Sequence, residues 1–297
     1  MPSRREFLTA VATAIAASRG VSAGAFSRPT SAAAALNGPV GLQLWSLREY
    51  LPKDLSGTLA KVKAMGFHEV EGAGLWGHSS ADFRKALDTA GLRCQSAHMG
   101  YERLRDDAAG AFAEAKAMGA TWVVCPWIPH DQGFTRQVTL AAAELFNRVG
   151  AAAEAAGLRF AYHSHGYEFV PSPEGTLFDT FIGATDPRRV AIQVDVFHTF
   201  HGGGNPARVI EALGSRVTSL HLKDLKKGAP VVAGAGVGTA DIDVPVGSGQ
   251  IDMPAVLAAA RKAGTSLYYV EDESATPLAN IPKSLAWLQA FTYPASR

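Results

Sequence analysis

The histidines of this chain fall at positions where they could act together. Of nine histidines, eight lie at or just beyond the carboxyl end of an apolar, β-branched run, and only His68 lies at the start of one. The eight are His78, His98, His130, His163, His165, His198, His201 and His221. A lone histidine at such a place is more often structural, but five at the ends of neighbouring runs indicate a shared site.

Three carboxylates occupy equivalent positions. Glu71, Asp195 and Glu271 each follow or end an apolar run. A buried carboxylate is costly unless it is paired or bound to a metal. Imidazole and carboxylate groups without cysteine suit one divalent ion such as Mn, Co, Fe, Mg or Zn, with open positions for substrate oxygens. The alternative is a buried His/Asp/Glu network that holds no metal.

Aromatic residues and one lysine accompany these groups. Six aromatic side chains lie near the same ends and could stack on sugar rings: Trp45, Trp76, Tyr101, Trp127, Tyr162 and Phe197. Lys223, two residues after His221, could bind a hydroxyl or neutralise a developing oxyanion. Its alternative role is that of an edge lysine whose amine reaches solvent. The combination favours a carbohydrate pocket.

The elements that must position these residues alternate between two kinds. Apolar β-branched runs predict strands over 40–47, 68–74, 93–99, 121–128, 159–165, 190–198, 217–224 and 266–273. Amphipathic stretches between them predict helices over 55–65, 81–90, 108–118, 138–156, 206–213, 253–263 and 278–291. Glycines at positions 66, 91, 119, 157 and 264 fit left-handed helix ends.

Eight strand–helix units predict a parallel sheet closed into a (β/α)8 TIM barrel, as a single domain. An open doubly wound sheet is the alternative. That fold would place a glycine-rich phosphate turn after the first strand, and Trp45-Ser46-Leu47-Arg48 is not one. In a barrel, the carboxyl ends of the strands form one face, which gathers the histidines and carboxylates.

The overall composition excludes several classes. The chain has 297 residues, of which 47% are hydrophobic and 19% are charged, so it can bury a large core. With 28 basic and 27 acidic residues it has no broad electrostatic affinity for nucleic acid. Cys94 and Cys125 are predicted to be small buried residues rather than a disulfide.

The amino terminus has the pattern of an export signal. Arg4-Arg5 precede Phe7-Leu8 and a short uncharged stretch that ends in small residues near Ala25. This pattern resembles a twin-arginine signal read by the export machinery, and the apolar run is too short to span a bilayer. We therefore expect a signal at 1–25, a linker at 26–39, the barrel at 40–297, and a periplasmic protein with no stable membrane insertion after cleavage. An alanine-rich disordered leader is the alternative.

The segment from Leu225 to Gln250 is predicted to be a long loop after the seventh strand. Such loops are often functional lids. Its Val246-Gly247-Ser248-Gly249 sequence could form a phosphate cradle, although this motif is weakly specific.

Motifs spread over the chain after Val40 resemble the sugar phosphate isomerase/epimerase family of xylose isomerase-like barrels. They include GLQLWSLRE, VEGAG, SAHMG, YHSHGYEF, QVDVFH, LHLKD, VGSGQID and YVEDE. The YHSHGYEF motif and the leader are similar to those of an exported branch of the family. The resemblance implies a metal-dependent enzyme acting on a sugar, keto-sugar or polyol.

The resemblance also implies roles for individual residues. The metal ligands are His163, Asp195, His221 and Glu271, and Glu271, His198 and Lys223 are catalytic. The substrate pocket contains Glu71, His98, His165, Trp45 and Trp127. Ketose epimerases have a glutamate on the fifth strand where this chain has His163, so Glu271 is the one obvious strong base, and Glu168 remains an alternative ligand from the fifth strand.

Proton abstraction next to a metal-bound carbonyl or hydroxyl serves isomerisation and epimerisation. The same site could eliminate or hydrolyse a keto-glycoside or inosose. Two other classes compete. An apurinic-site endonuclease would need a basic DNA-binding face, which the near-neutral charge disfavours. A periplasmic sugar-binding protein without catalysis would not need the inward carboxylates and histidines.

Overall fold

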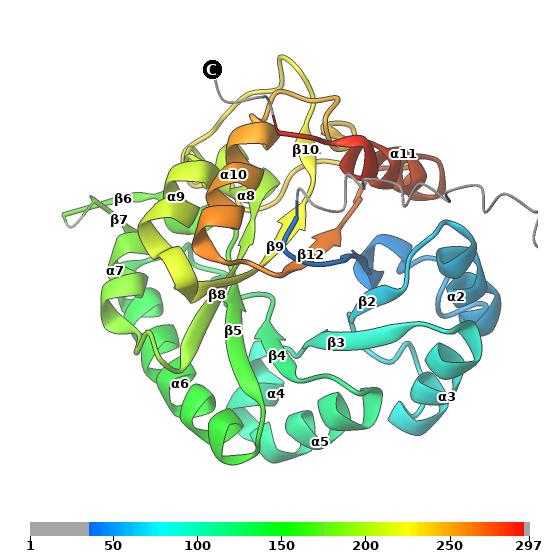
Figure 1. Cartoon of the computed structure of the whole chain (residues 1–297). Coiled ribbons are helices and arrows are strands. Elements are labelled where there is room, and N and C mark those ends of the chain that lie inside the picture. Colours follow the sequence, from blue (N-terminus) through cyan, green and yellow to red (C-terminus); the bar gives the residue numbers. More distant parts are fainter. Residues whose placement is uncertain (1–35, 174, 294–297) are drawn as a thin grey trace, which may run out of the picture. The chain divides into compact units, whose positions relative to one another are not determined.

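The computed structural model describes residues 36–173 and 175–293. The predicted signal at 1–25 and most of the predicted linker lie outside these residues. Eight parallel strands close into a barrel in the order β1-β12-β9-β8-β5-β4-β3-β2, which confirms the predicted (β/α)8 TIM fold (Figure 1). Within the described residues, no helix has the length and apolar character needed to cross a membrane.

The barrel strands are short, and most are buried. They are β1 (Val40–Gln43), β2 (Glu69–Gly72), β3 (Arg93–His98), β4 (Trp122–Cys125), β5 (Arg159–His163), β8 (Val190–Asp195), β9 (Val217–Leu222) and β12 (Leu267–Val270). Their register places polar residues of neighbouring strands at the same height. Gln43 pairs with Glu71, His163 with Gln193, and Asp195 with His221. The sequence therefore builds a polar layer inside the carboxyl half of the barrel.

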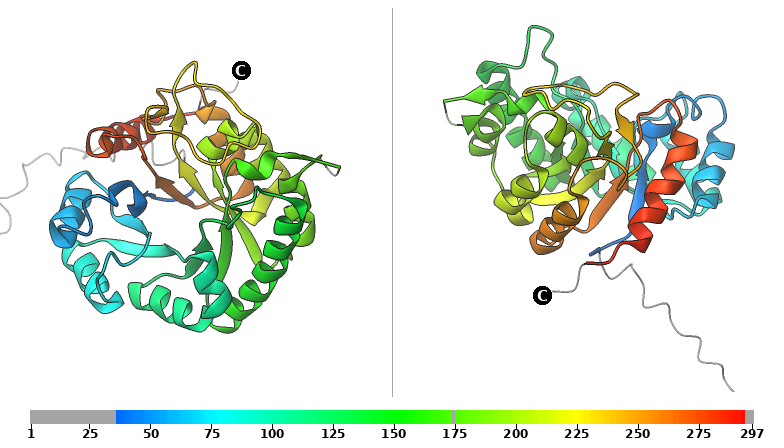
Figure 2. Two further views of the ribbon diagram at one scale, coloured as in Figure 1. Left: turned by 180° about the vertical axis from the view of Figure 1, so that it is seen from behind. Right: turned by 90° about the horizontal axis from the view of Figure 1, so that it is seen from above.

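Helices surround the strands (Figures 1 and 2). They are α2 (Leu55–Ala64), α3 (Ser80–Ala90), α4 (Tyr101–Asp106), α5 (Ala108–Met118), α6 (Arg136–Ala155), α7 (Leu177–Ala184), α8 (Val196–His201), α9 (Pro206–Leu213), α10 (Met253–Ala263) and α11 (Pro277–Ala290). Within the described residues, three 3-10 turns accompany them: η2 (Leu44–Leu47), η3 (Tyr167–Phe169) and η4 (Gly214–Arg216). Gly91, Gly119 and Gly264 end α3, α5 and α10 with φ of 67°, 93° and 79°, which confirms them as left-handed caps.

All eight predicted strands extend past the observed carboxyl ends, by one to four residues, and for two of them the structure shows the reason. The first strand ends at Gln43, whose side chain accepts from the backbone N–H of Trp45 and starts η2. The sixth strand ends at Asp195, so His198 lies on α8 rather than on a strand. Asp195 causes this change, because its Oδ1 accepts from the backbone N–H of His198 at 2.7 Å and caps the helix.

The predicted loop over 225–250 is partly ordered as a hairpin. β10 (Asp224–Leu225) pairs antiparallel with β11 (Asp243–Val244). A second small hairpin joins β6 (Pro171–Ser172) and β7 (Gly175–Thr176). The right-hand view of Figure 2 shows the connection after β9 at one end of the barrel and the start of β1 at the other.

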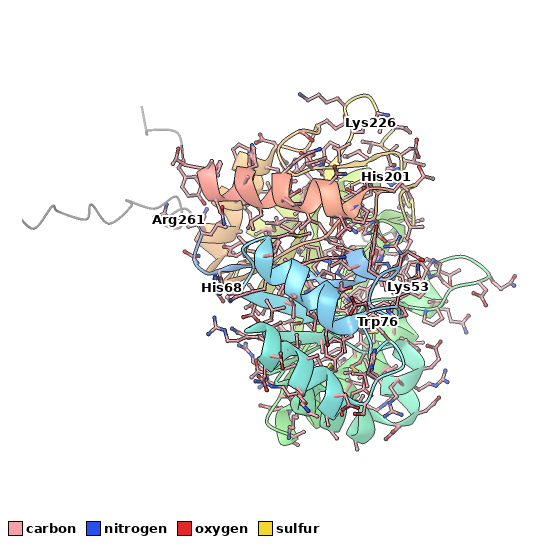
Figure 3. The ribbon with its side chains drawn as sticks, turned by 90° about the vertical axis from the view of Figure 1, so that its right-hand side faces the viewer. Lys53, His68, Trp76, His201, Lys226 and Arg261 are labelled. Carbon is pink, nitrogen blue, oxygen red and sulfur yellow. The ribbon has the colours of Figure 1, made fainter. Side chains whose placement is uncertain are left out.

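The two ends of the barrel separate the histidines as expected. His98, His163 and His221 lie in the carboxyl halves of their strands, and His201 follows β8 on α8. His68 precedes β2 at the opposite end, and Figure 3 shows it far from Trp76 and His201. Cys94 and Cys125 are both free and buried, which confirms their predicted role, and burial raises the pKa of each thiol to about 12.

Candidate metal centre and active site

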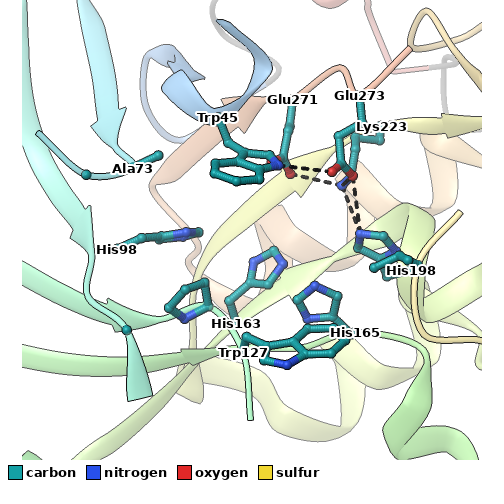
Figure 4. Close-up of a pocket in the computed structure, with 14 residues that line it drawn as sticks. Trp45, Ala73, His98, Trp127, His163, His165, His198, Lys223, Glu271 and Glu273 are labelled. Atoms are coloured by element: carbon teal, nitrogen blue, oxygen red, sulfur yellow. Dashed lines mark hydrogen bonds and ion pairs between the residues drawn. The ribbon is translucent and has the colours of Figure 1, made fainter. Parts of the chain in front are cut away.

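A cavity of about 460 Å³ opens at the carboxyl ends of the strands (Figure 4). Eight of the predicted site residues line it, namely Trp45, His98, Trp127, His163, His165, His198, Lys223 and Glu271. Asp195, His221 and Glu71 are fully buried and are not among the lining residues. The remaining walls come from Ala73, Gly74, Gly100, Pro126, Val237 and Glu273.

The four predicted metal ligands converge. The Nδ1 atom of His221 lies 2.8 Å from Glu271 Oε2 and 3.8 Å from Asp195 Oδ2. His163 Nε2 lies 3.9 Å from the same Asp195 oxygen. Asp195, His221 and Glu271 offer ligand atoms within 4.8 Å of one another, and His98, His163 and His221 form a second such group.

This donor set fits a divalent cation. Two imidazoles and two carboxylates suit Mn, Fe, Co or Zn. Asp195 Oδ2 is buried and accepts no hydrogen bond from the described residues, so it has unused capacity for a cation. His163, Asp195, His221 and Glu271 would hold the ion, as the sequence predicts.

An amide behind the histidines fixes their ring nitrogens. Gln193 Oε1 lies 2.9 Å from both His163 Nδ1 and His98 Nε2. Because an amide oxygen only accepts, both nitrogens donate to it, which leaves His163 Nε2 with a lone pair toward Asp195. Burial, reinforced by neighbouring histidines and Lys223, holds the pKa of His163 well below its usual value. Its ring is therefore neutral and can ligate a cation.

Glu71 was predicted to belong to the substrate pocket, but it does not line the cavity and lies behind His221. Its Oε2 lies 2.5 Å from His221 Nε2, and its Oε1 accepts from Ser96 Oγ at 2.5 Å and from Gln193 Nε2 at 2.8 Å. A carboxylate on the second nitrogen of a ligating histidine orients the ring and raises its basicity. Burial alone would lower the pKa of His221, but Glu271 and Glu71 raise it to about 10. Without a cation His221 is thus charged; with one, Nδ1 can release its proton.

Lys223 lies at the centre of a carboxylate cluster. Its Nζ is 2.9 Å from Glu271 Oε2, 3.1 Å from Asp195 Oδ2 and 2.8 Å from Glu273 Oε2. Burial opposes its charge, but these carboxylates raise its pKa well above the usual value. The side chain is buried, so it is not an edge lysine reaching solvent. Its Nζ is also 3.0 Å from His198 Nε2, which places the predicted catalytic residues together.

Glu273 is a site residue that the sequence reading missed. Its carboxylate accepts from Trp45 Nε1 at 3.2 Å and from Lys223 Nζ, and it lies 3.6 Å from His198 Nε2. The signal was its spacing of two from Glu271, which puts both side chains on one side of an extended chain. Gln43 and Gln193 were missed too, because a neutral glutamine in a sequence does not indicate a site until its partners are known.

Glu168 lies away from the cavity and does not join the metal group. Its carboxylate accepts from the backbone N–H of His165 at 2.9 and 3.1 Å and from the hydroxyl of Tyr162. Burial raises its pKa to about 7. Glu168 therefore fixes the turn that carries His165, whose ring stacks on His198 at 4.6 Å between centroids.

The whole arrangement matches one known family. Residues 59–291 match the family described as Xylose isomerase-like TIM barrel. The chain belongs to this family. Its sequence is 32% identical over 85 residues to an inosose dehydratase of Clostridium perfringens, a match that spans 29% of this chain and 28% of that protein.

Two solved structures are similar to this chain in fold. A sugar phosphate isomerase/epimerase from Parabacteroides distasonis aligns with a TM-score of 0.69 and 26% identity, over 85% of this chain and 94% of that one. An IOLI protein with a bound zinc atom aligns with a TM-score of 0.66 and 17% identity, over 87% of this chain and all of that one. At 17% identity, the similarity to the IOLI protein shows a shared fold and no more.

In this xylose isomerase-like barrel the charged side chains that line the cavity are concentrated on one wall. Burial opposes ionisation of Glu271, but Lys223 and His221 lower its pKa to about 2. Lys223 also lowers the pKa of Glu273, again against burial. Both carboxylates are therefore ionised at neutral pH, beside one ammonium group. Across the cavity, burial and nearby cations lower the pKa of His165, so that wall presents a neutral imidazole.

Proposed function

We propose that this protein is a divalent-metal-dependent enzyme that moves a proton next to a carbonyl or hydroxyl of a sugar, keto-sugar or polyol, as in isomerisation or epimerisation. The convergence of His163, Asp195, His221 and Glu271 beside a cavity large enough for a monosaccharide carries the proposal. A bound cation would polarise the substrate oxygen and acidify the adjacent C–H.

The chain's own residues would divide the remaining work. Glu271 is ionised, lines the cavity, and is placed to accept a proton. Lys223 and His198 would hold substrate oxygens, because both line the cavity. They are neighbours, since the ammonium of Lys223 donates to His198 Nε2 at 3.0 Å. Neutral His165 could accept a proton on the facing wall and, once protonated, return it to the substrate.

Elimination, as in a dehydratase or a keto-glycoside lyase, is a second candidate. Glu271 and Glu273 lie on the same wall, since both contact Lys223 Nζ. One face of the substrate would therefore meet both carboxylates, whereas epimerisation by paired carboxylates uses opposite faces. The partial similarity to an inosose dehydratase supports this candidate.

The test is exchange with solvent. Metal-loaded protein is incubated in deuterated water with keto-sugars, inososes and 3-keto-glycosides, and the products are followed by NMR. Deuterium uptake at one carbon without loss of water supports isomerisation or epimerisation, and formation of an unsaturated product supports elimination. Neither result with any substrate, together with sugar binding, would favour a non-catalytic binding protein.

We also propose that the protein is exported through the twin-arginine pathway to the periplasm. The support is the pattern of residues 1–25 alone. Replacing Arg4 and Arg5 by lysine should leave the protein in the cytoplasm, as measured by cell fractionation. Unchanged fractionation would contradict the proposal.

A further inference from the structure

The glycine-rich turn that could have bound a phosphate is already filled. Asp224 Oδ2 accepts from the backbone N–H groups of Gly247 and Gly249, each at 2.9 Å, and its Oδ1 accepts from Ile251 at 3.1 Å. Backbone amides gathered in this way form an anion cradle. Here the anion is the protein's own carboxylate, so the turn offers no phosphate site.

The cavity also lacks a free cation. Among the described residues that line it, Lys223 is the sole lysine or arginine. Its ammonium is already within 3.1 Å of three carboxylates, Asp195, Glu271 and Glu273. If a divalent ion balances Asp195 and Glu271, Glu273 still balances Lys223. No positive charge then remains for an anionic substituent.

The mouth of the cavity is aromatic instead. Trp45 and Trp127 are 42% and 36% exposed, and Figure 4 shows them on opposite sides of the histidines. Exposed indole faces suit the apolar face of a sugar ring. Glu273 contributes both to the aromatic mouth and to the lack of an unpaired cation. It accepts a 3.2 Å hydrogen bond from the Trp45 indole, and it neutralises the charge of Lys223.

We propose that the site selects uncharged ring sugars or polyols and rejects phosphorylated and acidic ones, and that Glu273 sets this charge selectivity. The inference rests on the proposed function, whose substrate class it narrows. A phosphate or carboxylate on the substrate would find the Lys223 ammonium already paired with Glu273 at 2.8 Å, so it would lose its solvation without gaining an ion pair.

The test compares matched ligands on metal-loaded protein. Binding of D-glucose, methyl β-D-glucopyranoside and myo-inositol is measured by saturation-transfer NMR and tryptophan fluorescence against D-glucose 6-phosphate and D-glucuronate. The proposal predicts at least about tenfold tighter binding of the best neutral ligand. Equal or tighter binding of the charged ligands, or no binding of any neutral one, overturns it.

Two variants test whether Glu273 causes the preference for neutral ligands. Glu273→Gln keeps an oxygen for the Trp45 hydrogen bond but removes the charge, so the preference for neutral ligands should narrow by about three- to tenfold. Glu154→Gln, an exposed change on α6 with the same effect on net charge, should leave the preference unchanged. If both variants keep the natural preference, Glu273 does not set it.

The deuterium-exchange assay separates this inference from the proposed function. Exchange with sugar phosphates alone would overturn the selectivity and leave the proposed chemistry standing. Tight binding of neutral ligands, with no exchange or elimination on any keto-sugar, would leave the selectivity standing and overturn the chemistry.

Discussion

Charged residues lie at both ends of this barrel, but their interactions differ between the two ends. The carboxyl end holds the histidines, Lys223 and the carboxylates. The amino end holds a smaller cavity of about 150 Å³ whose lining includes Arg159, Arg188, Arg189 and Arg216. The difference lies in whether the polar groups have partners.

At the amino end the guanidinium groups have partners. Arg216 donates to the carbonyl oxygens of Val190 at 2.9 Å and Ile182 at 3.1 Å, and to the hydroxyl of Thr185. Arg188 and Arg189 form ion pairs with Asp186 and Glu154, each at 3.2 Å. The guanidinium of Arg159 lies 4.1 Å from the centre of the Trp122 ring. These contacts stabilise the folded chain.

At the carboxyl end several buried polar atoms make no hydrogen bond, although Asp195 Oδ2 has the ammonium of Lys223 3.1 Å away. Nine buried side-chain atoms within the described residues make no hydrogen bond, and all but the Tyr269 hydroxyl lie at or beyond the carboxyl end of a strand. They include Asp195 Oδ2 and the Nδ1 atoms of His165 and His198. Unsatisfied buried groups cost stability, so their concentration at one end marks that end as built for ligands.

Among the substitutions that test this difference between the two ends, Asp195→Ala should have the largest effect. Removing this carboxylate should abolish metal retention and lower any exchange activity by roughly a thousandfold or more. Metal content of purified protein by mass spectrometry measures the effect. Asp195→Asn, which can still cap α8, is the control for folding. Full metal content in Asp195→Ala would exclude it as a ligand.

Glu168 tests the cost of a poorly compensated charge at the same end. Its pKa is raised from 4.5 to about 7, so the folded state binds its proton more tightly than the unfolded state. Its contribution to stability is therefore present below about pH 4.5 and lost as the pH rises to about 7, by about 3 kcal/mol. Glu168→Gln should remove that part of the pH dependence. Chemical denaturation at several pH values gives the difference, and parallel curves would refute the assignment.

Glu71→Gln tests whether the carboxylate behind His221 contributes to metal affinity. The amide keeps the shape behind His221 but loses the charge that orients the ring, so metal affinity should fall about 10- to 100-fold. Competition with a chelating dye measures the affinity. Glu69→Gln, a change on the same strand in a residue that bonds Gln95 instead, should have little effect on metal affinity.

Arg216→Met should show the opposite behaviour, with the smallest effect on function. It leaves two carbonyl oxygens without their donor, which should lower the free energy of unfolding by about 1–2 kcal/mol. Metal content and sugar binding should not change. A loss of metal with unchanged stability would show that the two ends are not separate in role.

The sequence predicted the barrel well because each strand is an apolar run and several helices end at a glycine, such as Gly91 or Gly119. The resemblance named four candidate metal ligands, and their side chains lie close together because each is at or next to the carboxyl end of its own strand. The sequence could not predict that Glu71 faces the back of His221 or that Glu273 joins Trp45 to Lys223. Those contacts depend on register and rotamer across strands far apart in sequence, as for Gln193 and Glu71.

The hydrogen bond from the backbone of His198 to Asp195 has an entropic consequence. One oxygen of Asp195 is used to begin α8, so the side chain loses its rotamer freedom when the chain folds. The other oxygen is then held in place before any cation arrives. Binding a cation would therefore cost little further side-chain entropy at Asp195. The same aspartate both caps α8 and holds one oxygen in place for the proposed metal.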